Sequence, residues 1–106
     1  MRRVRKAKDN ELDNTYGTYW QGDLHGVTYG QLLELYGTPQ FNEASGDDKV
    51  QFEWVFYVGD EVVTLYDWKT YDRNYSMYEL DEWHVGGKSL SAADEFIEYT
   101  NKVIRG

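Results

Sequence analysis

Alternation of apolar and polar positions is clearest in residues 50–58, where one of the two faces is entirely apolar. This period of two is typical of a β-strand with one buried face. The apolar face comprises Val50, Phe52, Trp54, Phe56 and Val58. Gly59-Asp60 is a common turn pair, and the alternation resumes over residues 61–68, so the two segments predict a hairpin.

Two further segments predict strands. Residues 15–24 are rich in strand-forming side chains but are interrupted by glycine, which is typical of a bulged or edge strand. Residues 78–85 form a last strand that runs into Gly86-Gly87. Residues 69–78, between the hairpin and this strand, predict an irregular polar loop that is rich in tyrosine.

Two helices are predicted where the apolar spacing changes to three and four residues. In the first, Thr28 caps a helix of about two turns, which Gly37 and Pro39 end. Its apolar positions are Tyr29, Leu32, Leu33 and Tyr36. The second begins at the capping-box-like residues 91–94 and ends with Lys102, Arg105 and Gly106, a favourable end for the helix dipole. Its buried face is expected to comprise Ala93, Phe96, Ile97, Thr100 and Ile104, with Trp54 packed against it at Phe96 or Ile97.

The predicted order is β-α-β-β-β-α, which indicates an α+β fold. We expect an antiparallel sheet of three to four strands with both helices on one face. Residues 15–106 are expected to form a single domain, because a chain of 106 residues is too short for two cores. Residues 1–14 lack periodicity and are expected to form a mobile arm.

The charge distribution divides the chain in two. Five of the eleven basic residues lie within the first eight positions, whereas all nineteen carboxylates follow them. Residues 9–106 therefore carry 19 acidic and 6 basic side chains, a net charge of −13. A body this acidic repels nucleic acid and anionic membranes, so its expected partner is a protein with a basic surface. The basic arm could touch nucleic acid or fold back onto the body.

Location is inferred from what the sequence lacks. The chain has no cysteine, which favours a reducing compartment. No apolar run approaches the roughly 20 residues that span a bilayer, and the basic start is not followed by the apolar segment of a signal peptide. We therefore expect a cytoplasmic protein without membrane contact.

Several short motifs between residues 26 and 89 support a resemblance to a known group. They are Thr28-Tyr29-x-x-Leu32, Tyr36-Gly37-x-Pro39, Asp48-Lys49-Val50-x-x-Glu53-Trp54, residues 64–69 and Trp83-His84-Val85-Gly86-Gly87-Lys88-Ser89. In these the chain resembles a family of small, mostly uncharacterised proteins encoded by bacteriophages and marked by a WHxGG motif. The resemblance implies an origin in a phage and a location in the host cytoplasm. It also implies stoichiometric binding of a host protein, as is common among small phage proteins.

Tyrosines and carboxylates near the last strand form the first candidate site. Tyrosine offers a rigid ring with a polar tip and is enriched where proteins bind each other. Spaced carboxylates can occupy a basic groove in place of nucleic-acid phosphates. The expected partner-binding residues are Tyr71, Arg73, Tyr75, Tyr78, Asp81 and Glu82. The alternatives are ordinary loop packing for the rings and a solvated surface for the charges.

Two further motifs have competing interpretations. Gly86, Gly87, Lys88 and Ser89 precede a predicted helix and could bind an anion, although the glycine spacing of a phosphate-binding loop is missing. The alternative is a plain strand-to-helix turn. His84 could meet Asp67 or Lys69 and act as a base or ligand, or it could be structural.

These observations favour a non-enzymatic protein that binds and inhibits or redirects a host protein. A system that handles nucleic acid or defends the host, such as CRISPR or restriction, is the expected target. No catalytic residue, metal or cofactor is expected, and the acidic body is not expected to bind nucleic acid directly. The alternative is a small-molecule or nucleotide-binding domain that uses the turn at residues 84–89.

Overall fold

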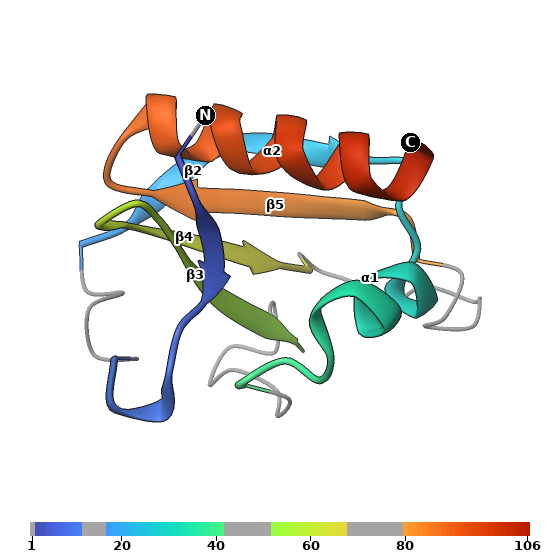
Figure 1. Ribbon diagram of the computed structural model, residues 1–106, viewed down its shortest axis with the longest axis horizontal. Helices are drawn as coiled ribbons and strands as arrows, with labels where there is room; N and C mark the ends of the chain where they lie inside the picture. The colour runs from blue at the N-terminus through green and yellow to red at the C-terminus, as the bar shows by residue number, and fades with distance from the viewer. Residues whose placement is uncertain (1, 12–16, 42–51, 68–79) are drawn as a thin grey trace.

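The chain forms one antiparallel sheet of five strands and two helices (Figure 1). A computed structural model describes residues 2–11, 17–41, 52–67 and 80–106. The elements are β1 (Val4–Lys6), β2 (Tyr19–His25), α1 (Tyr29–Tyr36), β3 (Glu53–Val58), β4 (Glu61–Tyr66), β5 (Glu82–Gly87) and α2 (Leu90–Arg105). The α+β class, both helices and the antiparallel sheet are confirmed, but the sheet has one strand more than the largest predicted number.

The order of strands across the sheet is β1-β3-β4-β5-β2. The hairpin of β3 and β4 turns at Gly59, whose φ of 63° lies in the left-handed region that glycine adopts freely. β5 pairs with β4, and β2 pairs with β5, so the strand that comes second in the chain lies at the edge. The other edge is β1.

The basic N-terminal segment supplies that additional strand. Val4 and Lys6 lie opposite Val58 and Phe56 across the β1–β3 pair. Arg2 forms ion pairs with Glu61 on β4 and Glu95 on α2. These residues lie against the body, as in the alternative that the basic arm folds back onto it, and the mobility of the arm stays a prediction. The strand was not predicted, because three residues are too few to show a period and its partner β3 is distant in the sequence. Residues 12–16, at the predicted junction of arm and domain, lie outside the described ranges.

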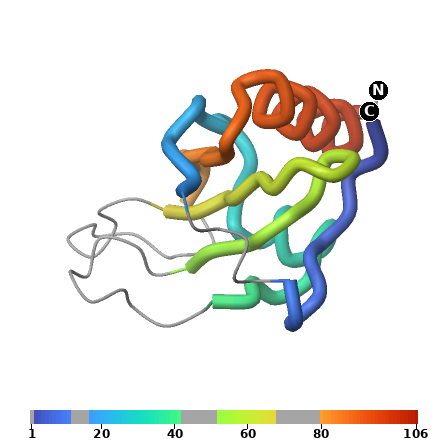
Figure 2. Tube along the Cα trace, turned by 90° about the vertical axis from the view of Figure 1, so that its left-hand side faces the viewer, coloured from blue at the N-terminus to red at the C-terminus, as the bar shows by residue number. Residues whose placement is uncertain are grey.

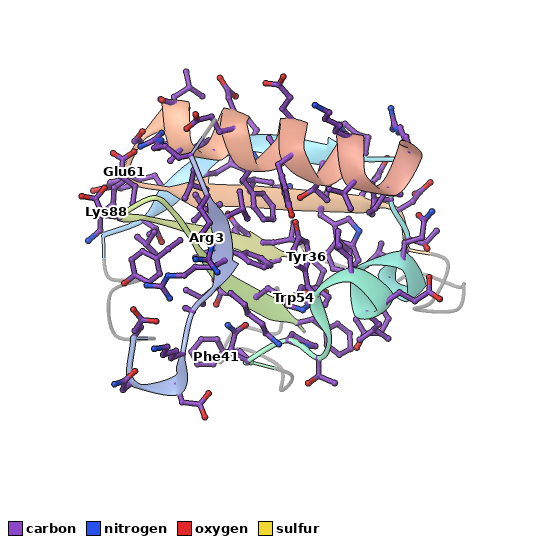
Figure 3. All side chains as sticks on the ribbon, in the orientation of Figure 1. Arg3, Tyr36, Phe41, Trp54, Glu61 and Lys88 are labelled. Carbon is purple, nitrogen blue, oxygen red and sulfur yellow. The ribbon has the colours of Figure 1, made fainter. Side chains whose placement is uncertain are left out.

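Both helices pack on the same face of the sheet, and Figure 2 shows α2 along one side of the strands. Phe56 of β3 packs on Phe96 of α2, with ring centroids 4.7 Å apart. Trp54 is fully buried, as predicted, and lies with Tyr36 between α1 and the sheet (Figure 3). Its ring contacts are with Tyr29 and Trp83. Phe96, the neighbour predicted for Trp54, packs on Phe56, two positions further along β3.

The helix boundaries follow their caps. Thr28 and Gln31 form a reciprocal capping box at the start of α1, which confirms the predicted cap. The cap of α2 is Ser89, whose oxygen accepts from the N–H of Ala92. The predicted start at residues 91–94 is therefore two residues late. Among the described residues, no helix has the length and apolar character needed to cross a membrane.

Candidate functional site

A β-bulge in edge strand β2 sets the geometry of the candidate site. Trp20 lies opposite Gly86, and Gly22 lies opposite Val85, so Gln21 is an extra residue in β2. The Gln21 side chain donates to the carbonyl of Gly87 at 3.1 Å. Residues three apart in a regular strand point to opposite faces. The bulge therefore places Trp20 and Asp23 on the same face of the sheet, the one opposite α2.

Asp23 is the centre of a compact group on this face, which we name the Asp23 cluster: Trp20, Asp23, His25 and His84. Nε1 of Trp20 donates to Oδ1 of Asp23 at 2.9 Å. Nε2 of His84 lies 3.9 Å from Oδ1, and Nε2 of His25 lies 3.8 Å from Oδ2. The ring centroids of Trp20 and His84 are 6.0 Å apart. The cluster combines a positioned carboxylate, an exposed indole and two imidazoles.

Partial burial affects the protonation of His84. Burial lowers the pKa of this imidazole, Asp23 raises the pKa to a smaller extent, and His25 lowers it. His84 is therefore neutral at pH 7, because even the ordinary pKa of histidine is about 6.5. At that pH the imidazole of His84 does not neutralise the carboxylate of Asp23.

The cluster continues as a row of titratable side chains across four strands. Asp23, His84, Tyr66 and Glu53 are successive cross-strand partners on β2, β5, β4 and β3. The rings of Tyr66 and His84 have centroids 5.6 Å apart. Burial raises the pKa of Glu53 to about 7, with a further contribution from the charge of Asp67. The far end of the row therefore exchanges a proton near neutral pH.

The described ion-pair partner of His84 is not one of the two residues predicted for it, Asp67 and Lys69. Trp83 points into the core, where its Nε1 donates to the carbonyl of Val27 at 2.8 Å. The buried Asp67 accepts from the N–H of Phe52 at 2.8 Å. Lys69 lies outside the described residues. His84 meets Asp23 instead, a pairing that depends on the position of β2 at the far side of β5.

Two of the predicted partner-binding residues extend this site. Glu82 lies opposite His25 in the β2–β5 pair, and the preceding Asp81 accepts from the N–H of Gly26 through its carbonyl. Both side chains are exposed. We name the exposed side chains of Trp20, His25, Asp81 and Glu82, together with the half-buried Asp23, the β2 surface. The other predicted partner-binding residues, Tyr71, Arg73, Tyr75 and Tyr78, lie outside the described ranges, and their role stays a prediction.

The residues of the predicted anion site form a strand-to-helix turn. Gly86 and Gly87 are buried in β5 and pair with strands on both sides. A Cβ at Gly86 would lie 2.6 Å from Oγ1 of Thr64, so packing requires glycine there. Ser89 caps α2 with its own oxygen.

Lys88, the cation of the predicted anion site, has acidic neighbours. It lines a pocket together with Asp60 and Glu61, and Figure 3 shows Lys88 near Glu61. These carboxylates disfavour an anion, since like charges at close range repel it. Anion binding at this turn stays a prediction, and the placement of its residues adds no support to it.

The Asp23 cluster was missed by sequence reasoning. The glycine-interrupted, aromatic sequence of residues 15–24 does predict a bulge or an edge, but spacing alone puts Trp20 and Asp23 on opposite faces. In the ranges that the structure describes, no three acidic or histidine side chains are arranged to hold a metal ion.

Comparison with known proteins does not assign the chain to a family. No family model matches it, and no curated protein or solved structure is significantly similar to it. The resemblance to small phage proteins therefore stays a prediction. A function of this chain can be proposed from the geometry and charge of its candidate site.

Proposed function

We propose that this protein acts without catalysis, by binding another protein through the β2 surface. The observation that carries the proposal is Trp20, which is 57% exposed on an edge strand and hydrogen-bonded to a carboxylate. The adjacent Tyr19 is 72% exposed. Tryptophan and tyrosine are the residue types that most often dominate protein–protein binding energy. The exposed indole of Trp20 therefore supports a binding surface on this face, whereas Tyr19 lies opposite Gly87 and points to the other face.

The charge of the surface favours a basic partner. Asp23, Asp81 and Glu82 lie near one end of the β2–β5 pair, on a body with 19 acidic and 6 basic side chains. Such a field attracts a positively charged surface and speeds its association. Proteins that handle nucleic acid carry basic grooves, which gain much of their affinity from charge. We therefore propose a target of this kind, in a host system of nucleic-acid handling or defence.

Openness of the site favours binding over catalysis. Catalytic acids and bases act best where water is excluded. The Asp23 cluster lies at an edge of the sheet, and the side chains of Asp23 and His25 are 34% and 66% exposed. A partner protein would cover these groups and supply the exclusion of water that they lack alone.

Quantitative affinity capture from bacterial lysate tests the proposal. The full chain serves as bait beside a Trp20→Ala/Asp81→Lys/Glu82→Lys variant. A control bait, Asp94→Lys/Glu98→Lys, carries as many charge reversals on the exposed face of α2. We expect a stoichiometric protein on the wild-type and control baits that is lost from the β2-surface variant. Equal recovery on all baits, or no stoichiometric protein on any bait, would overturn the proposal.

A further inference from the structure

We propose that the Asp23 cluster binds an arginine side chain of the partner protein, its guanidinium stacked on Trp20 and paired with Asp23. This inference rests on the proposed function and specifies the chemistry that the β2 surface recognises. It commits to arginine rather than to basic residues in general. Arginine is planar, weakly hydrated and able to stack on a ring while it donates to a carboxylate, whereas lysine is a compact, strongly hydrated charge.

The protein already holds one of its own arginines in this way, on the same face and at the opposite edge of the sheet. The guanidinium carbon of Arg5 on β1 lies 4.7 Å from the ring centroid of Tyr57 on β3. Nη1 and Nη2 of Arg5 donate to the two carboxylate oxygens of Glu11 at 2.8 and 2.9 Å. These bonds lower the pKa of Glu11 to about 2. An aromatic ring and a carboxylate together are therefore sufficient here to hold an exposed guanidinium.

The Asp23 cluster presents the same two groups. Among the residues that the structure describes, no arginine is paired with its carboxylate. Trp20 fixes Oδ1 of Asp23 through its Nε1 hydrogen bond. The other oxygen, Oδ2, is 3.8 Å from His25, a distance beyond that of a hydrogen bond. A guanidinium can therefore donate to Oδ2 while it lies over the exposed ring of Trp20. The carboxylate side chain is 34% exposed, which leaves it accessible from solvent.

The surrounding charges make this binding sensitive to pH. The titratable and charged groups around Asp23 are His25 on β2, Glu82 and His84 on β5, Tyr66 on β4, Glu53 on β3 and Arg105 on α2. Arg105 donates to the carbonyl of His25 at 3.3 Å. Nε2 of His84 lies 3.9 Å from Oδ1 of Asp23, so protonation of His84 places a positive charge beside the carboxylate. Acid therefore creates an internal competitor for the guanidinium.

Two peptides of equal charge test the proposal, one with three Gly-Arg repeats and one with three Gly-Lys repeats. Each is titrated into the full chain at pH 7.5, and binding is measured by isothermal titration calorimetry, which applies equally to the variant that lacks Trp20. We expect the arginine peptide to bind roughly three- to tenfold more tightly than the lysine peptide. The preference should disappear in Trp20→Leu and Asp23→Asn, and it should persist in Asp94→Asn, which removes the same charge from α2. Thermal melting of each variant confirms that it is folded.

Acidification supplies a second readout. At pH 5 the wild type should bind the arginine peptide more weakly than at pH 7.5, whereas a His84→Gln variant should lose less affinity over the same change of pH. Equal affinity for the two peptides at pH 7.5, or a preference that survives both Trp20→Leu and Asp23→Asn, would overturn the inference. The outcome is separable from that of lysate capture. If the β2-surface variant loses a captured partner but the wild type shows no arginine preference, the proposed function stands and only the guanidinium site is refuted. If the wild type prefers arginine but captures no partner through the β2 surface, the guanidinium site stands and the host-protein role is refuted.

Discussion

The indole rings of Trp54 and Trp83 meet edge to face, with centroids 5.6 Å apart and an interplanar angle of 75°. Each also anchors one end of α1. Nε1 of Trp54 donates to the carbonyl of Gly37, directly after the helix, and Nε1 of Trp83 donates to the carbonyl of Val27, just before it. The pair therefore joins β3 and β5 to both ends of a helix too short to be stable alone.

Replacement of Trp54 should show how much this contact contributes to the stability of the fold. Trp54→Ala removes a fully buried ring and leaves a cavity, so we expect a loss of about 3–5 kcal/mol in the free energy of unfolding. Trp54→Phe keeps a ring and should lose less. Urea denaturation followed by circular dichroism measures both. A loss under about 1 kcal/mol for Trp54→Ala would contradict the assignment of the core.

Removal of the basic strand should also destabilise the protein. Deletion of residues 1–8 removes the β1–β3 pairing, the packing of Val4 and the ion pairs of Arg2. We expect a clearly lower melting temperature at moderate salt. Single substitutions separate the causes: Arg2→Ala should be destabilising, and its effect should weaken as salt rises. Arg3→Ala, at an exposed neighbouring position, serves as the control. An unchanged melting temperature after the deletion would show that β1 is not docked in solution.

Glu53 should make the stability depend on pH. Its pKa rises from a usual 4.5 to about 7 in the folded chain, because burial and the charge of Asp67 disfavour ionisation. Its contribution is therefore fully present below pH 4.5 and is lost as pH rises to about 7. Relative to Glu53→Gln, the wild type should lose about 2–3 kcal/mol across this window. Urea denaturation at pH 5 and pH 8 measures it, and identical pH profiles for both proteins would refute it.

Gly86 should resist substitution for a steric reason. A Cβ there would lie 2.6 Å from Oγ1 of Thr64 and 3.2 Å from the carbonyl oxygen of Tyr19. We expect Gly86→Ala to cost about 1–3 kcal/mol. Thr64→Ala should recover part of this loss in the double variant, since it removes the closest atom. Additive effects in a double-mutant cycle would show that the two sites are not in contact.

The acidic end of the β2 surface should control the rate of association. For a captured partner, Asp81→Lys/Glu82→Lys should slow association, and the wild-type rate should fall as salt rises, because charges are screened over about 8 Å at physiological ionic strength. Trp20→Ala should mainly speed dissociation, since it removes an anchor. Stopped-flow or surface-based kinetics at three salt concentrations measures both rates. Association that is indifferent to salt would contradict electrostatic steering.

Local patterns in the sequence predicted much of the fold. The cap at Thr28, the turn at Gly59 and the apolar alternation through Trp54 and Phe56 each depend on near neighbours, and the structure confirms them. β1 was missed because three residues cannot display a period, and because its partner is β3, while the preceding Arg2 pairs with β4 and α2.

The candidate site was harder to predict because it is built by register. Asp23, His84, Tyr66 and Glu53 are far apart in the chain, and only the strand order brings them into one row. A bulge can be suspected from glycine in a strand, but its location between Trp20 and Gly22 cannot be read from composition. Asp81 and Glu82 could be predicted as binding residues from the sequence, because their charge is evident without knowledge of the strand register.

The extra residue in β2 has a consequence for how the chain tolerates insertions and deletions. An in-frame deletion of Gln21 would leave Trp20 and Asp23 two residues apart, and the strand could still pair with β5 along its length. Residues two apart in a regular strand share a face, so Trp20 would keep its place beside Asp23. The deletion would remove the bulge and the hydrogen bond of Gln21 to the carbonyl of Gly87. A register slip that closed the bulge without shortening the strand would instead place Trp20 opposite Gly87 and turn it to the side of α2. Loss of one codon would thus spare this surface, whereas a slip of β2 by one residue would dismantle it.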